Sequence, residues 1–167
     1  WDKEGYVEQW LERHAPRITA LQVGGFPVSL YLAPQLGLAG ARPVEATFGQ
    51  QVRLVAYEVQ EQVAAGGMLH LTLYWKTLLP PGRDYTVFAH LYDGSDVIWG
   101  QKDSPPVNGT YPTSQWRARE SIVDRYDIVV KSETATGNYY LVIGVYDPVT
   151  MLRLPTTGES ERLLSEN

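Results

Sequence analysis

The most regular feature of the chain is a two-residue alternation of apolar and polar side chains between residues 69 and 147. In Leu69–Lys76 the leucines and Trp75 fall on one face, while His70 and Thr72 fall on the other with the lysine. A β-strand with one buried and one solvated face has this period. Gly, Pro or Asp closes each run. The pattern predicts a mainly β fold, an antiparallel β-sandwich of the Ig-like or jelly-roll-like kind.

The alternating runs follow one another at the short, regular spacing that is typical of a sandwich. A tight hairpin at Asp93–Asp96 joins two of them, and Asp147–Thr150 turns the chain toward the last one. The predicted strands are Gln51–Val59, Met68–Thr77, Thr86–Tyr92, Val97–Lys102, Ile122–Val130, Tyr139–Asp147 and Leu152–Leu154.

The start of the chain has a different period. Apolar residues recur three to four positions apart and predict a short helix over Lys3–Arg13, with a stripe that includes Trp10. Ile18–Val23 and Phe26–Leu32 are predicted to form a hairpin, and residues 34–43 form a connecting loop. The helix stripe is too large to leave in water, so we expect residues 1–33 to pack on a sandwich of residues 44–164. Residues 1–167 then make a single domain.

The composition of the chain excludes several classes of function. The chain has 167 residues, 44% of them hydrophobic, which is enough for one core. Its net charge is −5 with scattered basic residues, so we expect no nucleic-acid partner. It has no cysteine, which excludes disulfides, thiolate zinc sites and cysteine nucleophiles. No apolar run is long enough to span a bilayer. We therefore expect the chain to be soluble as given. Because it opens at Trp1 rather than Met, we expect a fragment of a larger protein or a processed chain.

Few residues form a pattern with catalytic or metal-binding chemistry. Asp93, Asp96 and Asp103 cluster around a hairpin and are weak candidates for a Ca²⁺ site, although turn chemistry alone explains the Asp-Gly-Ser-Asp segment and an EF-hand spacing is absent. The three histidines carry no motif of a triad or a metalloprotease. Carboxylates that could imitate a glycosidase pair are better explained as exposed strand residues; they are Glu120, Asp124 and Asp127. We expect no enzyme activity in this chain and no cofactor.

Aromatic residues are the feature that most suggests a function. The chain has five tryptophans and eleven tyrosines, and aromatic ring faces stack on sugars. Trp75 and Tyr139 share faces with aliphatic residues and are expected in the core. Tyr111 and Trp116 lie in an irregular loop over 108–119, and with Trp99 they are candidate carbohydrate-binding residues. The alternative is that these rings pin the long loop to the core.

Five blocks of the sequence also carry a family resemblance. The blocks are Leu71–Lys76, Asp84–Asp93, Gln101–Pro106, Tyr111–Trp116 and Gly137–Pro148. In this order they resemble the C-terminal, extracytoplasmic β-sandwich domain of bacterial polytopic membrane glycosyltransferases, of the dolichyl-phosphate-mannose protein mannosyltransferase-like, Chloroflexi type. The opening residues 7–15 are similar to the segment that leaves the membrane region in those proteins. Residues 131–136 depart from the family's Pro-rich turn.

The resemblance implies a location on the extracytoplasmic face of the bacterial membrane, with the membrane portion of the parent protein as partner. It also implies that the catalytic carboxylates belong to that portion. Three functions stay open: a non-catalytic accessory domain that contacts an acceptor glycan or protein, a stand-alone carbohydrate-binding module, and a small enzyme assembled from distant residues. The absence of a reactive motif favours the first.

Overall fold

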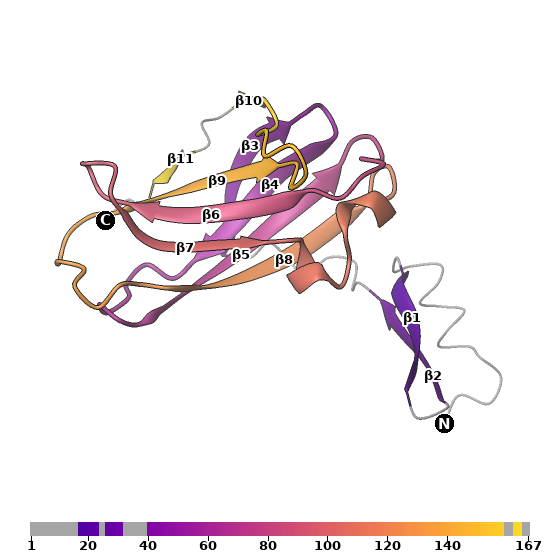
Figure 1. Ribbon diagram of the computed structural model, residues 1–167, viewed down its shortest axis with the longest axis horizontal. Coiled ribbons are helices and arrows are strands. Elements are labelled where there is room, and N and C mark those ends of the chain that lie inside the picture. Colours follow the sequence, from indigo (N-terminus) through magenta and orange to yellow (C-terminus); the bar gives the residue numbers. More distant parts are fainter. Residues whose placement is uncertain (1–16, 24–25, 32–39, 159–161, 165–167) are drawn as a thin grey trace.

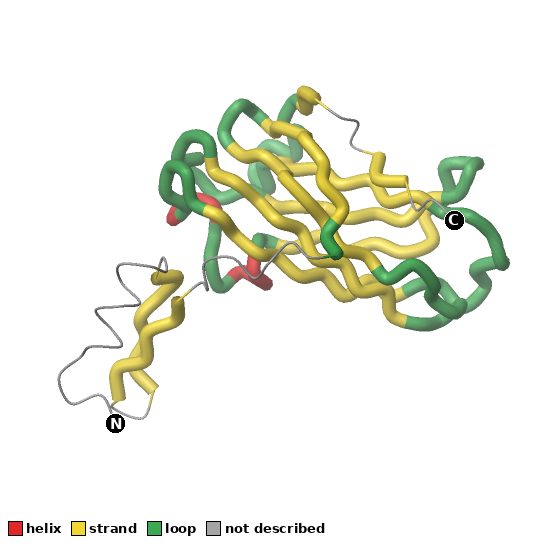
Figure 2. Tube along the Cα trace, turned by 180° about the vertical axis from the view of Figure 1, so that it is seen from behind, coloured by secondary structure: helices red, strands yellow, loops and turns green. Residues whose placement is uncertain are grey.

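Two antiparallel sheets lie face to face in a computed structural model of the chain, which describes residues 17–23, 26–31, 40–158 and 162–164 (Figure 1). Strands make up nearly all of both layers, and the short helical turns lie at one end (Figure 2). The predicted mainly β sandwich is therefore confirmed. Within the described ranges, no helix has the length and apolar character needed to cross a membrane. The helix predicted over Lys3–Arg13 lies outside the described residues.

One layer is a five-stranded sheet in the order β10-β3-β4-β5-β8. Neighbouring strands pair antiparallel throughout. The longest pairing joins β5 to β8, where Leu69 faces Ile128 and Trp75 faces Ile122. The strands are β3 (Arg42–Phe48), β4 (Val52–Val59), β5 (Met68–Thr77), β8 (Ser121–Val129) and β10 (Thr156–Gly158).

The other layer is a four-stranded sheet in the order β11-β9-β6-β7. Its central strand β6 pairs with β7 on one side and with β9 on the other, both antiparallel. The strands are β6 (Thr86–Tyr92), β7 (Ile98–Ser104), β9 (Tyr140–Tyr146) and β11 (Arg162–Leu164).

The sandwich is tied at both sides. Strands β7 and β8 belong to different sheets but meet through a Gly100–Val130 bridge, and the Lys131 N–H donates to the Trp99 carbonyl at 2.8 Å. On the opposite side β10 pairs with β3 and β11 pairs with β9, so the end of the chain contributes a strand to each sheet. These links cover sheet edges that would otherwise present unpaired backbone groups.

The core fills the space between the layers, as the alternation predicts. Trp75 is 1% exposed and meets the Phe48 ring edge-on at 5.7 Å between centroids. Burying aliphatic and aromatic surface of this kind is the main source of stability in a sandwich. The inward residues from the two sheets include Leu54, Leu71, Leu73, Ile122, Ile128, Val87, Ala89, Leu91, Ile143 and Val145.

A separate two-stranded sheet precedes the sandwich. It consists of β1 (Arg17–Val23) and β2 (Phe26–Tyr31), which pair antiparallel and confirm the predicted hairpin. Among the described strands, it shares no pairing with the two layers. The expected packing of residues 1–33 on the sandwich stays a prediction. Two 3-10 turns complete the described elements, η1 (Val107–Gly109) and η2 (Thr113–Gln115).

Candidate functional site

The outer face of the four-stranded sheet carries aromatic residues where a solvated face usually carries polar ones. In β6, Val87, Ala89 and Leu91 point into the core, so the intervening residues point outward. Strand β9 adds two tyrosines to the same face, because Tyr140 is paired with Tyr92 and Tyr146 with Thr86. We call this set the aromatic strip; it consists of Tyr146, Phe88, His90, Tyr92 and Tyr140.

Successive rings of the aromatic strip touch one another. Phe88 lies 6.3 Å from Tyr146 and 4.9 Å from His90, measured between ring centroids. His90 lies 6.2 Å from Tyr92, and Tyr92 stacks on Tyr140 at 5.8 Å with planes only 16° apart. These separations are those of favourable aromatic pairs. The strip is thus one continuous layer across two strands.

Phe88 is the most buried residue of the aromatic strip. Its ring covers Gly144 on β9, where an added Cβ would lie only 2.2 Å from the Phe88 ring. The Arg153 guanidinium lies over the ring at 4.5 Å, and Phe88 is only 2% exposed. Tyr92 and Tyr146 are half-buried, so each residue keeps some surface in contact with solvent.

Carboxylates border the strip and fix its polar groups. His90 Nε2 lies 2.8 Å from Asp103 Oδ1, and because an ionised carboxylate only accepts, the imidazole N–H donates to it. The Tyr140 hydroxyl donates to Asp96 Oδ1 at 2.7 Å. Burial raises the pKa of the Tyr146 phenol, and the Asp103 carboxylate raises it further. The face therefore combines ring surfaces with hydrogen-bond acceptors, the chemistry that binds a polyhydroxylated ligand.

The loop aromatics occupy a different place from the one expected of a sugar platform. Tyr111 and Trp116 are each 2% exposed, so neither ring presents a face to solvent. The Trp116 indole N–H donates to the Tyr111 carbonyl at 3.1 Å, and the Tyr111 hydroxyl donates to the buried Glu120 carboxylate at 2.8 Å. Burial, and then Glu120, raises the pKa of Tyr111 well above its usual value. This burial corrects the expectation that the loop exposes these two rings.

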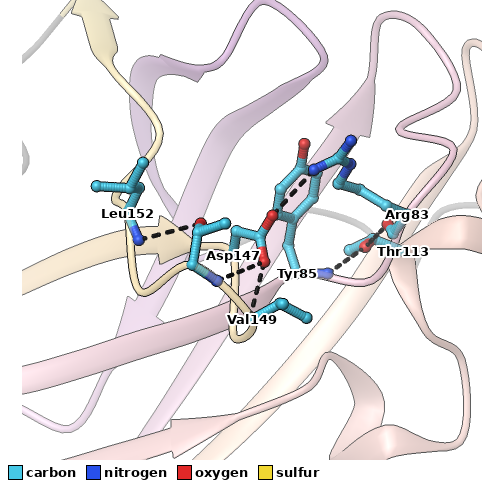
Figure 3. Close-up of polar contacts among 7 residues, drawn as sticks. Arg83, Tyr85, Thr113, Asp147, Val149 and Leu152 are labelled. Atoms are coloured by element: carbon cyan, nitrogen blue, oxygen red, sulfur yellow. Dashed lines mark hydrogen bonds and ion pairs between the residues drawn. The ribbon is translucent and has the colours of Figure 1, made fainter.

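A polar network holds the same end of the sandwich together. Thr113 Oγ1 accepts from the Tyr85 N–H at 2.8 Å and donates to the Arg83 carbonyl at 2.7 Å (Figure 3). Asp147 accepts from the Val149 N–H at 2.8 Å and pairs with Arg83 at 3.0 Å. The Val149 hydrogen bond is the main cause that lowers the pKa of Asp147. These hydrogen bonds and this ion pair hold the loop segments at this end of the sandwich together.

Trp99 lies apart from the aromatic strip. It is half-buried against the core, its ring meets Tyr139 edge-on at 6.4 Å, and its indole N–H donates to Asp93 Oδ2 at 2.7 Å. That bond is the largest of several that lower the pKa of Asp93 to about 2. The three sequence candidates Trp99, Tyr111 and Trp116 are therefore not brought together as one ring surface.

The aspartates proposed as weak metal candidates have other roles. Asp93 Oδ1 accepts from the Ser95 and Val97 N–H groups at 2.8 and 3.1 Å and so closes the hairpin turn. Asp96 accepts from the Tyr140 hydroxyl and Asp103 accepts from the His90 imidazole, and both donors belong to the aromatic strip. Among the described residues, no three metal-ligating side chains come together.

The carboxylates considered as a glycosidase pair are also separated. Glu120 and Asp124 are buried at 7% and 1% exposure, which corrects the expectation that both are exposed. Asp124 accepts from the Val107 N–H at 2.8 Å and from the Tyr126 hydroxyl at 2.6 Å. Burial raises the pKa of Asp124 to about 6, although these hydrogen bonds oppose the shift. Asp127 instead lies on the outer face and contacts His70 at 2.7 Å.

Sequence reasoning missed the strip, although a signal existed. In Thr86–Tyr92 and Tyr139–Asp147, the residues that alternate with the core positions include the five members of the aromatic strip. Rings at these outward positions distinguish this face from the outer face of the other sheet.

Comparisons with known proteins add information on the fold. No family model and no curated protein matches the chain. A solved structure described as the crystal structure of the C-terminal domain of Wzt is similar, with a TM-score of 0.52 over 75% of this chain and 77% of that one. The two sequences are 12% identical, so the likeness shows a shared β-sandwich fold alone.

Proposed function

We propose that this chain is a non-catalytic, glycan-binding β-sandwich domain and that the aromatic strip is its contact surface. The observation that carries this proposal is the continuous ring layer on the outer face of the four-stranded sheet, with Asp96 and Asp103 at its border. The half-buried Tyr92 and Tyr146 supply ring surface for the C–H face of a sugar. The carboxylates supply acceptors for its hydroxyl groups.

The parent context follows from the resemblance of the sequence blocks. We infer an accessory domain of a bacterial membrane glycosyltransferase, on the extracytoplasmic side, that holds an acceptor glycan near the catalytic membrane portion. A stand-alone carbohydrate-binding module is the alternative. The two differ in what the full reading frame encodes: membrane spans upstream support the accessory role, and their absence supports the independent module.

Affinity is expected to be weak. A surface of a few ring faces that buries little polar surface gives millimolar binding, about −4 kcal/mol. Calorimetric titration with mannose-, galactose- and glucose-containing oligosaccharides tests this, followed by product analysis after prolonged incubation. We expect saturable heat without turnover. Heat that is unchanged by Tyr146→Ala would contradict the strip as the contact surface, and turnover would contradict the non-catalytic proposal.

A further inference from the structure

The loop that follows β9 exposes aliphatic side chains to solvent. Val149, Met151 and Leu152 are 89%, 68% and 69% exposed, the three highest values among the large hydrophobic residues that the structure describes. Leu79, in the loop between β5 and β6, is 58% exposed. Single exposed apolar residues are ordinary on a protein surface, but three within four positions of one loop are not. We call these four side chains the apolar tip.

The two loops that carry the apolar tip lie at the same end of the sandwich. The Arg83 guanidinium of the β5–β6 loop pairs with the Asp147 carboxylate of the other loop at 3.0 Å (Figure 3). The turn at residues 49–51 also contacts both segments. Its last carbonyl accepts from the Leu79 N–H at 3.2 Å, and its first N–H donates to the Pro155 carbonyl, just beyond the other loop, at 3.0 Å.

The backbone N–H groups of residues 147–152 all have acceptors within the loop. Asp147 Oδ1 accepts from the N–H groups of Val149 and Thr150 at 2.8 and 3.3 Å. The Asp147 carbonyl accepts from the Met151 N–H at 2.8 Å, and the Asp147 N–H donates to the Leu152 carbonyl at 3.0 Å. The Leu152 N–H donates to the Thr150 hydroxyl at 3.4 Å. The remaining residue of the loop is a proline, which has no N–H.

The shorter loop has the same property. The N–H groups of Leu78 and Leu79 both donate to the Gln51 carbonyl, at 2.7 and 3.2 Å, and the next two residues are Pro80 and Pro81. An N–H group without an acceptor is costly in a lipid environment, so a loop that enters a bilayer surface must satisfy its own donors. A protein partner could supply acceptors and would not impose this requirement. The paired backbone therefore favours lipid as the occupant of the apolar tip.

Exposed arginines lie beside the apolar tip, although the whole chain has a net charge of −5. Arg153 follows the longer loop directly and is exposed. Arg117 and Arg119 are also exposed, and the Arg119 N–H donates to the Thr77 carbonyl at 2.8 Å, two residues before Leu79. None of the three arginines forms an ion pair with a described residue.

The carboxylates of the same segments offset only part of this charge. Asp147 is paired with Arg83, and Glu120 is 7% exposed and accepts from the Tyr111 hydroxyl at 2.8 Å. Asp84 is exposed and lies outside the described ion pairs. The end of the sandwich thus combines aliphatic side chains, a paired backbone and open guanidinium groups, which complement the acyl and phosphate layers of an anionic bilayer.

We propose that the apolar tip docks this domain on the surface of an anionic lipid bilayer. The aliphatic side chains enter the interfacial region, and Arg117, Arg119 and Arg153 face the phosphate head groups. This inference goes beyond glycan binding and does not rest on it, because glycan titration is carried out without lipid.

A single fluorescent label tests insertion directly. The chain has no cysteine, so Val149→Cys carries an environment-sensitive fluorophore at one position. Vesicles of phosphatidylethanolamine and phosphatidylglycerol in equal parts should make its emission stronger and shift it to the blue. Val129→Cys is the control, because Val129 is exposed at the opposite end of β8 from Ser121 and should show no change. Unchanged emission from the label at position 149, or an equal change from both labels, overturns the proposal.

Co-sedimentation of the unlabelled chain with the same vesicles adds a matched pair of variants. Val149→Ser with Leu152→Ser should lower the partition coefficient at least about tenfold, because two aliphatic side chains no longer leave water. Val97→Ser with Val129→Ser, at the other end of the sandwich, should change it less than twofold. Equal losses for the two pairs overturn the proposal. Self-association that depends on the tip, without vesicle binding, overturns the lipid assignment and makes the tip a protein contact.

The arginines are tested separately. Arg117→Gln and Arg119→Gln should each lower partitioning to the anionic vesicles about fivefold and leave partitioning to phosphatidylcholine vesicles unchanged. The difference should shrink as salt is added, because salt screens exposed charges. Equal partitioning of parent and arginine variants at low salt overturns the choice of an anionic surface.

Discussion

The two outer faces of the sandwich carry different kinds of side chain. On the five-stranded sheet, the outward side chains pair as polar neighbours: His70 with Asp127 at 2.7 Å, and the Tyr74 hydroxyl with Glu58 at 2.7 Å. On the four-stranded sheet, the outward positions form the aromatic strip. Both sheets bury aliphatic residues inward, so the inner faces do not account for the difference.

The largest expected effect concerns a ring that belongs to neither face. Trp116→Ala should lower the free energy of unfolding by about 4 kcal/mol, because it empties a buried aromatic site. Urea denaturation of parent and variant measures this. A midpoint that does not move would mean that Trp116 is exposed in solution, and the loop aromatics would again compete with the strip as the binding surface.

The next effect tests whether the strip is a packed layer. Phe88→Ala should cost about 3 kcal/mol although Phe88 lies on an outer face, because the ring is only 2% exposed. Gly144→Ala should cost about 2 kcal/mol, since the new Cβ meets the Phe88 ring. The two changes should be strongly non-additive in the double variant, where the clash is gone. Additive costs would show that Phe88 does not cover Gly144.

A smaller effect is expected at Asp124, whose carboxylate lies on the opposite side of β8 from that of Asp127. The pKa of Asp124 is raised in the folded state to about 6, so the folded chain binds this proton more tightly than the unfolded chain. The contribution to stability is fully present below the unfolded pKa of about 4 and is lost as the pH rises through about 6.

The free energy of unfolding of Asp124→Asn, taken relative to that of the parent, should therefore be higher at pH 7 than at pH 4, by on the order of 2 kcal/mol. Chemical denaturation at both pH values measures the difference. Asp127→Asn, on the exposed side of the same strand, is the control. Parallel pH profiles of Asp124→Asn and parent would contradict a buried, protonatable Asp124.

The smallest expected effect is on the polar face. His70 and Asp127 have side chains that are 66% and 69% exposed, and exposed ion pairs contribute little. His70→Ala should change the free energy of unfolding by less than about 0.5 kcal/mol. A loss as large as that of Phe88→Ala would remove the distinction between the two faces.

Much of the fold could be predicted because alternation reports burial directly. Strands β5 and β6 match their predicted ranges, and β4, β7, β8 and β9 differ by one or two residues at their ends. The predicted strands do not include β3 (Arg42–Phe48): the predicted loop over 34–43 covers its first two residues, and no strand is predicted over 44–48. Strands β10 and β11 have three residues each, too few to show a period. The predicted strand Leu152–Leu154 is instead a single bridge at Arg153.

The candidate site was harder to predict, for a physical reason. Whether an aromatic residue in a loop is exposed depends on contacts between distant segments. Trp116 is buried through Tyr111 and its loop through Thr113 and Arg83, and no local pattern encodes these links. The outward tyrosines of β6 and β9 could have been identified from alternation, but their union into one strip depends on the β6–β9 register.

The central claim is that one outer face binds glycan and the other does not. One pair of variants tests it most directly: Tyr92→Ala in the strip, and Tyr74→Ala at an outward position of the five-stranded sheet. Titration of each folded variant with the oligosaccharide that binds the parent should show about a tenfold loss of affinity for Tyr92→Ala, ~1.4 kcal/mol, and less than a twofold loss for Tyr74→Ala. Equal losses, or a larger loss for Tyr74→Ala, would contradict the assignment of function to the aromatic strip.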